Sequence, residues 1–178
     1  MTHSAALPFE LRRSQDVVAA TEITSTRETI HGLLRLDGDR LIVQWRVARS
    51  TDRVGAEIRT DHEMEPVREV TLPLSALAAA RVRRVWWQWP PGSRIVLTAA
   101  DLRAFEEIAG GSGLRLSHPA ELSLPIRRAD RLAALEFASE LELAMAERAL
   151  AAAQDRPTLA SGDGQVAGAR RLPDHRDG

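Results

Sequence analysis

Residues 29–47 read TIHGLLRLDGDRLIVQWRV and contain the pattern that decides the fold. Apolar side chains occupy every second position on both sides of Asp37-Gly38, and such alternation predicts half-buried β-strands. An Asp-Gly pair supplies the positive φ angles of a tight hairpin turn. The stretch therefore predicts an antiparallel hairpin with one buried face. That face holds Ile30, Gly32, Leu34 and Leu36 on the first strand and Leu41, Val43, Trp45 and Val47 on the second.

Short strand-like segments continue after the hairpin. Residues 48–65 are charged and poorly patterned, which favours either a loop or an exposed edge strand. Pro73 places the next strand at an edge or a bend, because proline donates no hydrogen bond to a ladder. A short helix is expected after the capping sequence at residues 98–101. Further strands are expected at residues 67–74, 80–87, 94–98, 114–117 and 122–126.

A long helical segment, residues 127–153, follows the last of these strands. Its apolar residues recur with the spacing of a helix instead of the alternation of a strand. One broad side holds Ala134, Phe137, Ala138, Leu141 and Met145. Glu136, Glu140 and Glu147 form a narrow stripe elsewhere. The apolar surface extends further round the helix than one sheet usually covers, which predicts a second contact with another copy or a partner protein. The residues of this extension are Leu132, Leu135, Leu143 and Leu150.

The chain is long enough for one domain with tails. Residues 1–21 are expected to form a lead-in that is either a short helix or extended. Residues 22–152 are expected to form the domain. Residues 153–178 are rich in proline, glycine, aspartate and arginine, and we expect this tail to be disordered because it has little to bury.

Composition restricts the classes of partner and of chemistry. The 178 residues carry 24 basic and 25 acidic side chains. This balance argues against nucleic acid as a partner and against more than a peripheral membrane contact. The absence of cysteine excludes disulfides, thiolate metal sites and cysteine nucleophiles. Neither a signal peptide nor a transmembrane segment is evident, so we expect a cytoplasmic protein.

One strand has a composition suited to binding. Tryptophan faces and guanidinium groups can together hold a base or a phosphate. Strand alternation divides this group between two faces, however, so core tryptophans with arginines at the rim are the favoured interpretation. The candidate residues are Arg81, Arg83, Arg84, Trp86, Trp87 and Trp89.

The other motifs indicate no chemistry. Asp61-His62-Glu63 resembles part of a metal or acid–base cluster, but the remaining histidines lack ligand spacing. Gly110-Gly111-Ser112-Gly113 matches neither a nucleophile elbow nor a dinucleotide-binding loop. We therefore assign no catalytic, metal or cofactor residues.

The pattern as a whole resembles that of a bacterial pleckstrin-homology-like domain. The likeness lies in residues 32–36, 41–45, 70–77 and 122–126, with the last running into 131–143. It implies a mainly β, α+β fold: a seven-stranded, partly open antiparallel barrel capped by a C-terminal helix.

Lipid-binding members of that family hold inositol phosphates with basic residues around the first hairpin. Arg35, Arg40 and Arg46 flank the hairpin here, but Asp37 and Asp39 lie in its turn and repel phosphate. Protein binding is the other common use of the fold.

We therefore expect a non-enzymatic protein-interaction module, with self-association through the last helix as one form of that role. The alternative is a binder of an anionic ligand, membrane surface or nucleic acid through the arginine- and tryptophan-rich strand. A small hydrolase has the least support.

Overall fold

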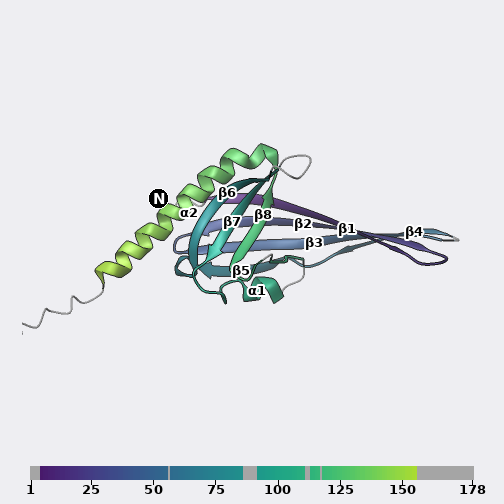
Figure 1. Ribbon diagram of the computed structural model, residues 1–178, viewed down its shortest axis with the longest axis horizontal. Helices are drawn as coiled ribbons and strands as arrows, with labels where there is room; N and C mark the ends of the chain where they lie inside the picture. The colour runs from purple at the N-terminus through teal and green to yellow at the C-terminus, as the bar shows by residue number, and fades with distance from the viewer. Residues whose placement is uncertain (1–4, 56, 86–91, 111–112, 117, 156–178) are drawn as a thin grey trace, which may run out of the picture.

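The computed structural model describes residues 5–55, 57–85, 92–110, 113–116 and 118–155. Strands dominate the described residues, and the single long helix is C-terminal, as the sequence predicts (Figure 1). The strands are β1 (Ala6–Val18), β2 (Ile23–Asp37), β3 (Arg40–Val54), β4 (Ile58–Met64), β5 (Arg68–Pro73), β6 (Leu77–Val85), β7 (Gly92–Ala99) and β8 (Glu121–Ile126). The helices are α1 (Glu106–Gly110) and α2 (Arg131–Gln154), with short 3₁₀ turns η1 (Leu74–Ala76) and η2 (Arg128–Asp130).

The predicted hairpin is confirmed. β2 and β3 pair antiparallel from Asp37 and Arg40 outward, and Gly38 in the connecting turn has a φ of +58°. That angle favours glycine, which has no Cβ to clash with the backbone. The turn chemistry therefore sets the register of the longest strand pair in the molecule.

The strands form two antiparallel sheets, and neither is closed. β1-β2-β3-β4 is the order in the first sheet, with β5 also paired to β3, and β6-β7-β8 is the order in the second. β5 pairs with the first part of β3, and β4 pairs with its last part. The mainly β, α+β class is thus confirmed, while the strands divide as five and three rather than as seven in one barrel.

The hydrophobic core lies between the two sheets and α2. Leu7, Leu34 and Val43 of the first sheet are completely buried, as is Leu97 of the second. A Cβ at Gly32 would lie 2.0 Å from the ring of Phe9, so glycine is needed there for that ring to pack against β2. α2 closes the core with Ala134, Phe137, Ala138 and Leu141.

The first sheet continues well beyond the core as a four-stranded arm (Figure 1). The arm consists of residues 12–18, 23–29, 48–54 and 58–64, which are paired strand to strand throughout. None of these residues is buried on either face of the sheet. Of the two alternatives for this charged stretch, β4 is therefore an exposed edge strand, whereas residues 48–54 continue β3 between β2 and β4.

The structure also decides three further expectations from the sequence. Of the two alternatives for the lead-in, the extended one is confirmed, because β1 pairs with β2 along its whole length. The strand expected at 114–117 is wrong for the described residues 114–116: Gly113 at φ +96° turns the chain, and Leu114 enters the core. α1 begins only at Glu106, since Asp101 accepts a hydrogen bond from the Arg103 amide within a preceding turn.

Candidate interaction surfaces

The leucines predicted to extend the apolar surface of α2 form one exposed face. Leu132 and Leu150 each lie nine residues from the buried Leu141, which is two and a half helical turns and hence the opposite side. The exposed fractions are 74% for Leu132, 41% for Leu135, 61% for Leu143 and 61% for Leu150. We call this set the leucine face. α2 thus has two apolar stripes, and the body of the protein covers only one of them.

The C-terminal part of α2 extends past the sheets (Figure 1). Every described residue from Ala146 onward is exposed. A helix that ends free in water gains nothing from tertiary packing over its last turns. The leucine face therefore continues along a segment that is accessible from most directions.

Glutamates border the leucine face. At 100° per residue, Glu136, Glu140 and Glu147 lie along one side of the stripe, and Glu142 lies on the other. All four are exposed, and among the residues of α2 only Arg131 places a basic side chain beside the stripe. The surface combines leucines with a negative border.

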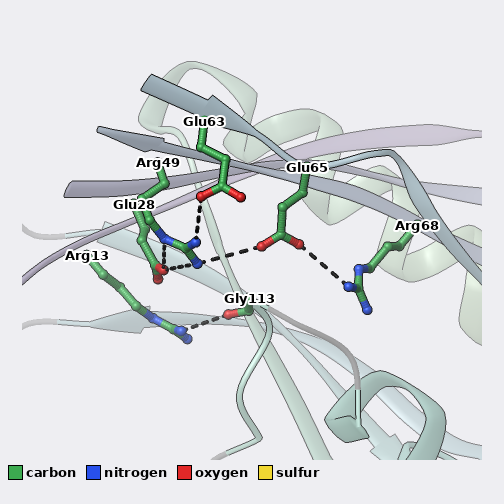
Figure 2. Close-up of polar contacts among 7 residues, drawn as sticks. All are labelled: Arg13, Glu28, Arg49, Glu63, Glu65, Arg68 and Gly113. Carbon is green, nitrogen blue, oxygen red and sulfur yellow. Dashed lines mark hydrogen bonds and ion pairs between the residues drawn. The ribbon is translucent and has the colours of Figure 1, made fainter. Parts of the chain in front are cut away.

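A row of charged side chains marks the place where the core ends and the arm begins (Figure 2). Arg13, Glu28, Arg49 and Glu63 lie directly opposite one another on four neighbouring strands. They point to the same face of the sheet as the core residues, one pleat beyond Ile30 and Val47. We call these four residues the charged row.

Arg49 is the centre of that row. Its Nε and Nη2 donate to Glu28 Oε1 at 3.0 and 2.9 Å, and its Nη1 donates to Glu63 Oε2 at 3.1 Å. The hydrogen bond to Glu28 raises the pKa of Arg49 above its ordinary value. Glu65 Oε1 lies 3.6 Å from Arg49 Nη2, and its other oxygen lies 3.6 Å from Arg68. Each of these carboxylates thus has an arginine partner.

Pairing of this kind favours a structural role for the charged row. A general base or a metal-binding carboxylate needs a free lone pair in a shielded place, whereas these oxygens face guanidinium groups. No group of three or more His, Asp and Glu side chains in the described ranges is arranged to hold a metal ion. Asp61 and Glu63 each contact an arginine, and His62 lies on the other face of β4.

Arg13 connects the charged row to the connection before β8. Its Nη1 donates to the carbonyl oxygen of Gly113 at 2.7 Å (Figure 2). A Cβ at Gly113 would lie 2.6 Å from Val47 Cγ2, and φ at this residue is +96°. Glycine is therefore required by both space and backbone geometry where this segment closes the end of the core.

The arginine-rich strand is only partly described. Arg81, Arg83 and Arg84 are exposed on β6, and Arg83 lies opposite Arg94 of β7. Arg81 and Arg83 share one face of the strand, while Arg84 takes the other. Trp86, Trp87 and Trp89 lie outside the described residues. The alternative function that depends on them stays a prediction.

One apolar surface was missed by sequence reasoning. Val18, Ile23, Val54 and Ile58, at the far end of the arm, are all exposed and lie opposite one another in the sheet. The four are scattered over 41 sequence positions, so no local pattern unites them. Only the pairing register of the four strands could have revealed that these residues lie together.

Comparison of the chain with protein-family models, with curated proteins and with solved structures finds no match. None of the described helices combines the length and the apolar character needed to cross a bilayer. The surfaces of the molecule itself must therefore support any functional proposal.

Proposed function

We propose that this chain is a non-enzymatic, cytoplasmic protein-interaction module of pleckstrin-homology-like architecture, whose partner binds the leucine face of α2. The leucine face carries the proposal. Four large aliphatic side chains aligned on the side of a helix opposite its packed side have no role in the core. A partner that covers them removes apolar surface from water, which is the main driving force of protein association.

The assignment of architecture rests on the order of elements. Two antiparallel sheets are followed by one C-terminal helix, whose Phe137 and Leu141 close the core between them. The antiparallel strands followed by a closing helix agree with the family resemblance, although the strands form two open sheets rather than one seven-stranded barrel. A non-enzymatic role is supported by the carboxylates of Glu28, Glu63 and Glu65, each of which is paired with Arg49.

Charge identifies the kind of partner. Two leucine faces packed together would bring their glutamate borders close to one another in an antiparallel pair, and like charges oppose association. A partner helix with leucines on one stripe and arginine or lysine beside it would pair favourably with Glu136, Glu140 and Glu147. We therefore infer that the partner is an amphipathic helix with a basic border.

Two synthetic peptides test this proposal. Both are helical with one leucine stripe, and they differ only in having arginine or glutamate on the borders of the stripe. We expect the arginine peptide to bind the full chain at least about tenfold more tightly in fluorescence anisotropy. Equal affinity for the two peptides, or no binding of either, contradicts the proposal.

Substitutions then locate the binding surface. Leu143→Glu and Leu150→Glu should each weaken binding of the arginine peptide about tenfold or more, because a charge replaces a buried contact. Leu102→Glu, at a residue 62% exposed outside α2, is the matched control and should leave binding unchanged. Combined Glu136→Arg, Glu140→Arg and Glu147→Arg should reverse the preference in favour of the glutamate peptide.

The same variants test the self-association alternative. If the leucine face binds a second copy, Leu143→Glu will reduce the mass measured by light scattering. If it binds a basic helix, that mass will stay constant while peptide binding falls. The outcome separates the two kinds of partner.

A further inference from the structure

The end of the arm carries a continuous aliphatic row. Val18 pairs with Ile23, Ile23 with Val54, and Val54 with Ile58, so four strands contribute one side chain each to the same face. Their exposed fractions are 75%, 47%, 45% and 78% in that order. We call this set the tip row. Branched aliphatic side chains favour a sheet because they pack on neighbours, and here a covering layer is missing from the described chain.

The arm is also a single layer of sheet. Stable sheets normally bury at least one face against a second layer. None of the arm residues is buried, and this holds for both faces. A second sheet packed on the tip-row face would supply that layer.

The same face of the arm has a hollow nearer the body. Its volume is about 450 Å³, and it is lined by Thr29, Ala48 and Met64 together with the polar residues Arg27, Arg49, Ser50, His62 and Glu63. Met64 is 63% exposed. Thr29, Ala48 and Met64 form a cross-strand row with Arg12, three pleats from the tip row on that face. The arm thus presents both an aliphatic row and a recess in which Ala48 and Met64 offer apolar surface for such a row.

The charges between these two places alternate in sign. Next to the tip row lies a row with Asp16 and Asp52, and the following row contains Arg27 and His62. Arg27 is 69% exposed, and its nitrogen lies 4.0 Å from Asp52, so this internal ion pair is long. An acidic row beside a basic row is complementary to its own reversed copy.

We propose that two copies of this chain associate through their arms, packed face to face with their strands antiparallel. A two-fold axis between the row with Asp16 and Asp52 and the row with Arg27 and His62 places the tip row of each copy over the recess at Met64 of the other. The same axis places Asp16 and Asp52 over the row with Arg27 and His62. The interface is isologous, as expected for a closed dimer. Sheet faces pack about 10 Å apart, which is the distance that such side chains fill.

Charge complementarity favours a second copy as the occupant of this face. In the proposed packing, Asp16 and Asp52 of one copy lie over the row with Arg27 and His62 of the other, and the two-fold axis repeats this contact in reverse. Opposite charges at these two adjacent levels favour a second copy over a lipid surface or an unrelated protein.

Cysteine cross-linking tests the register directly, because the natural chain has no cysteine. The double variant Ile58→Cys with Met64→Cys should form a disulfide-linked dimer on mild oxidation, seen by mass spectrometry without reductant. Both positions lie on β4 about 20 Å apart, too far for a bond within one chain. The matched control, Ile58→Cys with Leu132→Cys, should remain unlinked. A control that links equally well, or a test variant that does not link, overturns the proposal.

Solution mass gives the second readout. Light scattering should show twice the chain mass for the wild type and a dissociation constant raised about 100-fold or more by Ile58→Asp. Circular dichroism should be unchanged in this variant, since Ile58 is exposed and its loss leaves the core intact. A monomeric wild type, or a dimer that survives Ile58→Asp, refutes the proposal. Loss of the dimer in Leu143→Glu would instead assign self-association to α2.

Discussion

β2 and β3 run through both the body and the arm of the molecule, but their side chains are buried only in the body. In the body, Ile30 of β2 lies opposite Val47 of β3, and both are buried. One pleat further on, Glu28 lies opposite Arg49, and beyond them no residue of the arm is buried. The hydrogen-bonded ladder continues unchanged across this boundary. Pairing alone therefore extends a sheet, while burial needs a second layer that only the body possesses.

α2 makes the same contrast around its circumference. One stripe is buried on the sheets and the opposite stripe is exposed, although both consist of apolar side chains. Substitutions on either side of each boundary measure how sharply these buried and exposed regions differ.

The largest contrast is expected within α2. Phe137→Ala should lower the free energy of unfolding by about 3–5 kcal/mol, because it removes a ring that is 2% exposed and leaves a cavity. Leu143→Ala on the leucine face should change it by less than about 0.5 kcal/mol. Urea denaturation followed by circular dichroism measures both. Similar losses would mean that the leucine face also belongs to the core.

A large effect is also expected where the core ends against the connection before β8. Gly113→Ala should cost about 3 kcal/mol, since its φ is +96° and the new Cβ would meet Val47. Gly110→Ala is the control, because nothing lies within 4 Å of its Cβ position. It should alter the free energy of unfolding by less than about 1 kcal/mol. Equal tolerance of both changes would contradict this account of the closed core end.

Two valines on the same face of the first sheet compare body and arm directly. Val47→Ala should lower the free energy of unfolding by about 2 kcal/mol, because Val47 is 1% exposed. Val17→Ala at the arm end, 53% exposed, should lower it by less than about 0.5 kcal/mol. Thermal unfolding curves of the two variants give the comparison. A cost at Val17 close to that at Val47 would show that the arm has a covered face in the single chain.

The smallest effect is expected at the boundary itself. Arg49→Gln should cost about 1 kcal/mol, since Arg49 is partly exposed and water screens its ion pairs. Amide hydrogen exchange should increase in the arm more than in the body, because the charged row holds the four strands together where the arm begins. Arg59→Gln, at a 72% exposed arginine paired with Asp61, is the control and should leave exchange in the arm unchanged. An exchange increase confined to the body would contradict this role.

Much of the fold follows from local sequence pattern. Alternation around Asp37-Gly38 predicts β2 and β3, Pro73 predicts an edge position for β5, and residues 127–153 match η2 and α2 within a few positions. The pattern fails after Val47, where charge replaces alternation although β3 continues to Val54. Such a strand is held by its neighbours on both sides, and a single stretch of sequence contains no information about them.

The leucine face was accessible to sequence reasoning, and the tip row was not. Leu132, Leu135, Leu143 and Leu150 lie within one helix, so their spacing shows that the helix is apolar around too much of its surface. Val18, Ile23, Val54 and Ile58 come from four strands, and only the pairing of those strands aligns them.

The sequence by itself determined the first hairpin, the mainly β class with a C-terminal helix, the absence of cysteine chemistry and the surplus of leucine on that helix. These depend on spacing between near neighbours, which local backbone geometry converts directly into faces. The tertiary structure alone decided which stripe of α2 the body covers, where Arg49 and its glutamates end the core, and how the arm presents its tip row. These depend on contacts between distant segments, which exist only once the chain has folded.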